Sequence, residues 1–558
     1  MIKKSRYSIS LLIFIFIVQV FIYYLLFKER LFYYFNINTH VHSIDALRFY
    51  NLLYLRSPFQ NIIHQFFSPG HWPRLHYAFT ALFISLFERN YMSMAMVNVL
   101  YLLILMISVY GITIEITKNR WCALLSSFLI SAYPGTIQFM KIFELPIGVI
   151  AFTSLSIYFL ILSNYFKKTI YTILFAIFVC FSMYMDRATP IIFIIGPVGY
   201  TLYRAIKEIR SKNFDKKISL NIFLMSLIIF IILSPFYITW IKCYLLDKNR
   251  FLAMSGVWTG HSRTEVWKQV INFSSPFFFK RIFFYLTVFP NWLLGSFWSI
   301  LFLCSIPLFL KNKYRHTYIF LWWLILPIIF FTIIPKKDFS YIMPVLSPIA
   351  IMTSIGFYSL KNHLLRICSL AIIFLFGIAQ FIIFVFCLDT RPNSLIRRKL
   401  FTNINMARSD PIIFDAIPPN FGNNKNKNFC RWVSKDVIKF LPLNGKFKIA
   451  IVKMRGITWG DYLLGVFMLL RNPLADVLLL FLPPECEQFI SSGSDYVVFV
   501  KRTDFQEDLN SAVKGWVAFY DINLDKFKIN LYDYALVCKK LHPDLPIEIE
   551  IYSKSSLE

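Results

Sequence analysis

The sequence predicts a polytopic α-helical membrane protein with about eleven transmembrane helices, followed by a water-soluble α/β domain. Of its 558 residues, 57% are hydrophobic and 19% are aromatic, and the 61 Phe residues gather in long apolar runs. The run 11–27 approaches the roughly 20 residues with which a helix crosses the hydrocarbon core. A soluble protein of this composition would expose too much apolar surface to water, so most of the chain is predicted to lie in a membrane.

Apolar runs separated by short polar segments mark the predicted spans. The first run is long and has no small-residue cleavage site, so we expect an uncleaved first span and not a signal peptide. The predicted spans are residues 8–27, 92–114, 121–139, 146–164, 169–185, 189–206, 218–242, 284–310, 317–335, 341–360 and 366–388. They define a membrane module, 1–390, with a long first outer loop at 28–91, and a C-terminal domain, 391–558.

The formal net charge of +28 fits membrane topology better than a nucleic-acid partner. Six basic clusters between the apolar runs fall on one side, which the positive-inside rule assigns to the cytoplasm. The first loop, the turns near Glu144 and Asp186, and the C-terminal domain then face outward. Arg397 and Arg398 run against this pattern, but large domains translocate largely regardless of charge. We therefore predict a bacterial inner-membrane protein whose active face and C-terminal domain lie in the periplasm or outside.

The C-terminal domain has the alternating pattern of a small layered α/β domain. A helix is predicted from about Asp461, between the first and second of three strand-like segments. The apolar stretch 462–483 contains Arg471 and Pro473, which disfavour a membrane span. The three strand-like segments are residues 446–454, 475–483 and 495–501.

No metal or cofactor site is predicted. The nine Cys residues form no CxxC pair and no metal-ligand spacing. His42, His71 and His76 share the first outer loop, but no acidic or Cys cluster completes a metal site, so structural or substrate-binding roles are expected. Carboxylate oxygens are good ligands for divalent ions, so the prediction that the protein needs no metal requires its own test.

The first outer loop is unusually long for a helical bundle, and such loops tend to be functional. Residues 39–55 place Asp45, Arg48 and Tyr50 just beyond the first span, and the apolar residues of the segment that follows predict a helix lying in the interface. A second amphipathic stretch follows a Pro- and Gly-containing break within residues 68–90.

The segment from Ile44 to Tyr50 resembles the D-E-x-x-[RY]-[YF] pattern in the first outer loop of the GT-C glycosyltransferases. The similarity is to the branch that contains protein O-mannosyltransferases and lipid A aminoarabinose transferases. Asp45 matches the first acid and Arg48 the basic position, whereas Ala46 replaces the second acid. Three further stretches resemble the family in the same order: 139–160 with Glu144 at the acidic position, 184–203 with Arg187, and 333–352 with Lys336, Lys337 and Tyr341 but with Ser340 where Arg is common.

This resemblance implies transfer of a sugar from a polyprenyl-phosphate donor to a protein, lipid or glycan acceptor at the outer membrane face. Such a reaction needs a base for the acceptor, cations for the departing phosphate and an apolar groove for the lipid. The resemblance implies Asp45 as general base and Glu144 as a second catalytic residue. Residues expected to bind substrate are Arg48, Tyr50, Arg187, Lys336, Lys337 and Tyr341.

Each candidate also has a structural interpretation. Asp45 could be an ordinary loop carboxylate, and Glu144 could cap the next helix. Arg187 could pair with its acidic neighbour, and Lys336 and Lys337 could anchor the chain at the interface. Among other functions, a transporter would need internal repeats and mid-membrane charges, which the sequence lacks. A lipid-linked polysaccharide polymerase or ligase would be expected to carry its large outer loop late in the bundle.

Overall fold

The computed structural model forms two compact units. The helical unit comprises Met1–Glu29, Ile63–His76 and Ala95–Pro418, and the second unit comprises Arg30–Ile62, Tyr77–Met94 and Pro419–Glu558. The boundary predicted at residue 390 stays a proposal about how the chain divides. The structure describes residues 2–30, 37–54, 63, 66, 74–186, 189–211, 216–246, 284–285, 293–312, 314, 316–333, 339–386, 432, 436–442, 448–453, 476–480, 495–502, 534–541 and 547–554.

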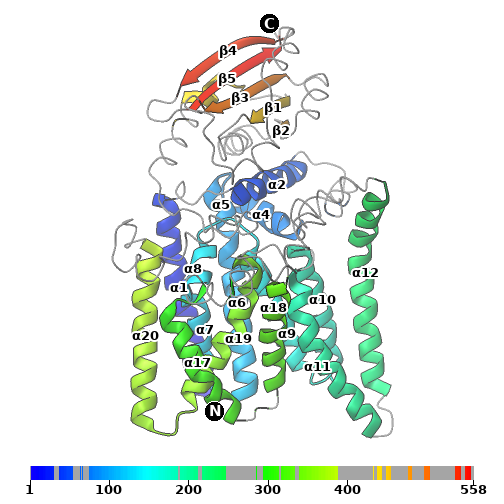
Figure 1. Cartoon of the computed structure of the whole chain (residues 1–558), viewed down its shortest axis with the longest axis vertical. Helices are drawn as coiled ribbons and strands as arrows, with labels where there is room; N and C mark the ends of the chain where they lie inside the picture. Colours follow the sequence, from blue (N-terminus) through cyan, green and yellow to red (C-terminus); the bar gives the residue numbers. More distant parts are fainter. Residues whose placement is uncertain are drawn as a thin grey trace, which may run out of the picture. The chain divides into compact units, whose positions relative to one another are not determined.

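Long apolar helices lie side by side in the helical unit (Figure 1). Every predicted span contains a helix among the described residues. The helices are α1 (Ile2–Arg30), α6 (Val97–Thr117), α7 (Arg120–Ala132), α8 (Pro134–Met140), α9 (Pro146–Leu162), α10 (Thr169–Met185), α11 (Thr189–Ser211), α12 (Lys216–Leu246), α17 (Ser296–Lys311), α18 (Thr317–Ile333), α19 (Leu346–Tyr358) and α20 (His363–Phe386). The 3-10 helix η3 (Phe339–Val345) leads directly into α19.

Length and composition make six described helices long and apolar enough to cross a membrane, or seven if the bent pair α7–α8 counts as one span. Large apolar side chains point outward from these helices, as Phe230 on α12 and Leu375 on α20 do, at 69% and 67% exposed. An apolar face of this kind needs lipid or a partner to cover it. The chain is therefore a multi-pass membrane protein, and the count of about eleven spans remains a prediction.

The third predicted span is broken. α7 and α8 meet at an angle of 59°, with Tyr133 in an extended conformation between them and Pro134 as the first residue of α8. Pro has no N–H to continue the hydrogen bonds of a helix, but its fixed φ suits the first helical position, so it ends α7 and starts α8. The short helix α8 then leads into a turn at residues 141–145. Because of the break, α8 does not continue along the axis of α7.

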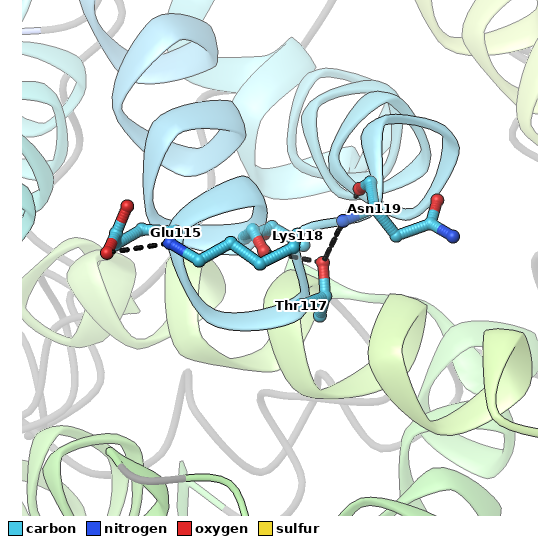
Figure 2. A network of polar contacts seen from close by, with 5 residues as sticks. Glu115, Thr117, Lys118 and Asn119 are labelled. Carbon is cyan, nitrogen blue, oxygen red and sulfur yellow. Dashed lines mark hydrogen bonds and ion pairs between the residues drawn. The ribbon is translucent and has the colours of Figure 1, made fainter. Parts of the chain in front are cut away.

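The turn between α6 and α7 is closed by its own side chains (Figure 2). Lys118 adopts the left-handed conformation at φ 53° and pairs with Glu115 at 2.8 Å. The Asn119 side chain caps α7 by accepting from the Cys122 N–H at 3.1 Å, and the backbone N–H of Asn119 donates to Thr117 Oγ1 at 3.1 Å. These bonds satisfy backbone groups that helix ends leave without partners.

The turn between α9 and α10 contains three successive left-handed residues, 164–166, with φ values of 51°, 60° and 64°. This conformation costs about 1–2 kcal/mol for each residue with a side chain, so surrounding contacts must hold it. Asn221 of α12 donates to the Phe166 carbonyl at 2.7 Å, and the Arg204 guanidinium of α11 lies 5.6 Å from the Tyr165 ring centroid. Two later helices therefore complete this turn.

The second unit contains a five-stranded mixed sheet in the order β2-β1-β3-β5-β4 (Figure 1). β1 pairs in parallel with β2 and β3, whereas β5 pairs antiparallel with β3 and β4. Val498 of β3 lies opposite Ile551 of β5, and both side chains are fully buried. The three predicted strands are confirmed, but the predicted helix from Asp461 lies outside the described residues. The strands are β1 (Lys448–Lys453), β2 (Asp476–Leu480), β3 (Tyr496–Arg502), β4 (Tyr534–Leu541) and β5 (Ile547–Lys554).

Candidate functional site

The helix α2 (Ile37–Tyr54) carries three of the candidate residues, so a helix already begins before them and not only in the segment that follows. Asp45 and Arg48 lie one turn apart and form an ion pair with a 3.8 Å separation. The Asp45 side chain is 14% exposed and that of Arg48 is 44% exposed. Asp45 thus combines a neighbouring cation with a side chain that is mostly shielded from water but still accessible to a ligand.

Aromatic and basic side chains connect α2 with the rest of the second unit. His42, one turn before Asp45, forms a buried hydrogen bond with the Tyr77 hydroxyl at 2.7 Å between Nδ1 and Oη. The guanidinium of Arg89 lies 5.8 Å from the centroid of the Tyr50 ring, within the range of a cation–π contact. His42 and Tyr50 of α2 therefore form contacts with other residues of the second unit, and these contacts hold the helix that carries Asp45.

The turn after α8 holds two buried charged residues of opposite sign. Lys141 is 4% exposed and Glu144 is 6% exposed. Proteins seldom bury such groups without charge or hydrogen-bond partners. Leu145 occupies the N-cap position of α9 and makes no side-chain capping hydrogen bond, so Glu144 is not the N-cap residue.

A buried asparagine organises this turn. Asn98 lies on α6, and its Nδ2 donates to the carbonyls of Ile142 at 2.8 Å, Phe139 at 3.2 Å and Met140 at 3.4 Å. The Asn98 side chain is fully buried. The path of the backbone between α8 and Glu144 is therefore fixed by a side chain more than forty residues earlier in the sequence.

His76 packs against the same turn from the first outer loop. It lies in α4 (Leu75–Leu86), where its ring centroid is 4.6 Å from that of Phe143 and its Nδ1 is 3.1 Å from the Tyr101 hydroxyl. Complete burial lowers the pKa of His76 to about 3, because the charged imidazolium would lose its hydration. His76 is therefore neutral at physiological pH and packs beside the turn, which fits the structural one of the two roles expected for it.

Tyr341 is the one described member of the fourth motif that was predicted to bind substrate. It lies in η3, which packs against α9, and its ring stacks on Phe331 with a centroid distance of 5.8 Å. The helical unit thus gathers Glu144, at the start of α9, and the element that carries Tyr341. Arg187, Lys336 and Lys337 lie outside the described residues. Asp45 belongs to the second unit and Glu144 to the helical unit.

The described residues hold no group of three or more His, Cys, Asp or Glu side chains arranged to bind a metal. His71 lies outside them. Two residues of the site, Lys141 and Asn98, were not selected from the sequence. Lys141 lies in the family-like stretch 139–160, three residues before Glu144. A lysine so close to a candidate carboxylate is a sequence signal that could have identified it. Asn98 carried no such signal, because nothing near it in sequence shows what its side chain binds.

No protein-family model matches the chain, and no curated protein matches its sequence. The fold is similar to that of ArnT from Cupriavidus metallidurans, in a structure with undecaprenyl phosphate bound (TM-score 0.56, 11% identity, 97% of each chain covered) and in the apo state (TM-score 0.55, 11% identity, 99% of each chain). It is also similar to the Archaeoglobus fulgidus oligosaccharyltransferase in complex with Zn and sulfate, with a TM-score of 0.50 and 14% identity over 97% of this chain and 73% of that one.

Proposed function

We propose that this chain, which has the fold of the GT-C membrane glycosyltransferases, transfers a sugar from a polyprenyl-phosphate donor to a protein, lipid or glycan at the outer membrane face. The observation that carries the proposal is the likeness to ArnT over 97% of both chains, since it includes the first outer loop and the C-terminal region as well as the bundle. That ArnT structure holds undecaprenyl phosphate, and a second similar structure is an oligosaccharyltransferase.

We propose Asp45 as the general base. Its carboxylate accepts the proton of the acceptor hydroxyl or amine as the hydroxyl oxygen or amine nitrogen attacks the anomeric carbon of the donor sugar. The bond between that carbon and the phosphate oxygen breaks, and polyprenyl phosphate leaves with the electron pair, so the reaction inverts the anomeric centre. The 14% exposure of Asp45 supports this role, because the group is accessible but partly shielded from water.

The leaving phosphate gains negative charge, which cations at the interface can stabilise. Arg187, Lys336 and Lys337 are proposed for this task, each following an apolar helix near its end. Glu144 is proposed to orient the acceptor or Arg187, and its burial would hold its carboxylate in one position. Arg48, Tyr50 and Tyr341 are proposed to contact substrate.

We propose that the active face lies in the periplasm, with the chain in a bacterial inner membrane. The C-terminal domain is proposed to bind the acceptor or a partner protein, since the acids proposed for the chemistry lie in the first 150 residues. A shortened chain that ends near residue 395 should then still bind the lipid donor. Loss of donor binding in a shortened chain that remains folded would contradict this division of labour.

The reaction is proposed to need no metal ion. The purified protein should therefore keep its transfer activity in the presence of EDTA. Loss of transfer on chelation, with recovery on addition of Mn²⁺ or Mg²⁺, would overturn this part of the proposal.

The proposal as a whole is tested by comparing cells that carry the gene with cells that lack it. Mass spectrometry of surface glycans, lipids and glycoproteins should find one sugar missing after deletion, which identifies donor and acceptor. The purified protein in liposomes should then form that glycosidic bond from the matching polyprenyl-phosphate sugar, while Asp45→Asn should not. Movement of a solute across the liposome membrane without any new bond would instead identify a transporter.

A further inference from the structure

One side-chain amide closes the turn that carries the two buried charges. The Nδ2 of Asn98 lies 2.8 Å from the Ile142 carbonyl oxygen and within 3.4 Å of the carbonyl oxygens of Phe139 and Met140. An amide nitrogen has two hydrogens, so three acceptors require at least one shared bond. The shortest of the three, to Ile142, joins α6 to the residue directly after Lys141.

The carbonyls of Phe139 and Met140 have a particular need for a donor, whereas that of Ile142 also accepts the Glu144 N–H at 3.1 Å. Phe139 and Met140 lie in the last turn of α8, where the helix itself supplies no N–H partner, and their surroundings are buried. The orientation of the amide follows from the same contacts, because rotating it would place Oδ1 against three carbonyl oxygens. Asn98 is therefore a donor with a defined orientation.

We propose that Asn98 is a positioning residue for the transfer reaction. By closing the turn from Phe139 to Ile142, it fixes the direction in which the buried Lys141 and Glu144 side chains leave the backbone. This inference rests on the proposed function, in which Glu144 orients the acceptor or the phosphate-binding arginine. Displacement of such a group by about 1 Å can slow a reaction about a hundredfold, so the hydrogen bonds of Asn98 would act on the chemistry through Glu144.

The chain offers a matched control. Asn221 on α12 is also buried, and its Nδ2 donates to the carbonyl of Phe166 at 2.7 Å in another turn between two helices. The residues from 163 to 168 of that turn include no predicted site residue. Replacing either asparagine removes a buried amide that holds a turn, but only the turn held by Asn98 carries Glu144.

The test compares Asn98→Ala, Asn98→Gln and Asn221→Ala in the full chain, using thermal unfolding and steady-state transfer. We expect both alanine variants to unfold at lower temperatures than the wild type. Of these two alanine variants, Asn98→Ala alone should lose kcat, by about ten- to a hundredfold, with a change in donor KM of less than about threefold. Asn98→Gln keeps the amide on a longer stem and should fall between Asn98→Ala and the wild type. Equal losses of kcat in Asn98→Ala and Asn221→Ala would overturn the proposal, and if Asn98→Ala does not fold, wild-type kcat in Asn98→Gln would overturn it.

A second measurement does not depend on the reaction. Lys141 is buried in the wild type, so an amine-reactive reagent followed by mass spectrometry should label it slowly. Asn98→Ala should raise this labelling by at least about tenfold, and Asn221→Ala should leave it unchanged. If the wild type transfers no sugar, the proposed function fails while the labelling still tests the turn. Slow labelling of Lys141 in a folded Asn98→Ala variant would overturn the control of this turn by Asn98.

Discussion

The imidazole of His76 lies against the ring of Phe143, with centroids 4.6 Å apart, and burial lowers the pKa of His76 to about 3. In the unfolded chain the imidazole of His76 has its ordinary pKa of 6.5. Below pH 6.5 the unfolded state therefore binds a proton at His76, whereas the folded state does so only near pH 3. Stability is therefore full above pH 6.5 and falls as the pH drops toward 3, by about 2 kcal/mol between pH 6.5 and 5. Thermal unfolding in detergent across this range measures it. His76→Phe keeps a ring beside Phe143 and should flatten the slope, and an unchanged slope would disprove the assignment to His76.

Asp45→Asn is expected to fold and insert normally. The amide keeps the size of the carboxylate but cannot accept a proton, so the rate of transfer should fall by about a hundredfold to ten-thousandfold. Glu144→Gln should lose less, because that residue is proposed only to orient its partners. Transfer rates and unfolding temperatures of the two variants in purified form provide the check. If Asp45→Asn retains transfer while Glu144→Gln abolishes it, the two carboxylates exchange roles.

Arg187→Ala and Lys337→Ala should weaken donor binding. Each removes a cation proposed to hold the lipid phosphate, so the affinity for polyprenyl phosphate should fall by roughly ten- to a hundredfold. Binding of a labelled polyprenyl phosphate to the purified protein measures this. Lys118→Ala is the control, since Lys118 is exposed, pairs with Glu115 and lies on the side predicted to be cytoplasmic. Equal losses in all three variants would point to general electrostatics in place of a site.

Gly356→Ala should destabilise the helical unit. A Cβ at Gly356 of α19 would lie 2.7 Å from the backbone oxygen of Ser305 on α17, so the two helices would have to separate. Overpacking of this kind costs about 1–3 kcal/mol. Gly199→Ala is the matched control, because a Cβ there meets no atom within 4 Å. Unfolding temperatures that drop equally in both variants would show that the close approach does not matter.

The apolar runs predicted where helices occur because a span must satisfy its own backbone, which ties helix formation to composition. The fold expected from the resemblance, which was drawn from short motifs around Asp45 and Glu144, agrees with the fold that the chain shares with ArnT. The break at Pro134 was missed, although Pro followed by Gly inside an apolar run is a signal for one. β5 was also missed, despite the alternation of Ile and Glu in residues 547–551.

The hydrogen bonds from Asn98 to the 139–142 turn could not be predicted from the sequence. Asn98 reads as a lone polar residue in a span, and its partners are backbone carbonyls, which have no sequence identity. The burial of Lys141 and Glu144 depends in the same way on which helices pack around them. Local patterns therefore predict elements, whereas the site depends on contacts between residues far apart along the chain.

The left-handed turn between α9 and α10 also constrains the order of assembly in the membrane. Synthesis delivers α9 and α10 to the bilayer before Arg204, Asn221 and His316, whose side chains contact Tyr165 or the carbonyl of Phe166. Before those later segments are synthesised, their contacts cannot stabilise the left-handed backbone conformation of residues 164–166. The hairpin of α9 and α10 therefore gains these contacts only after α11, α12 and the segment before α18 have been synthesised, which makes completion of this turn a late step in biogenesis.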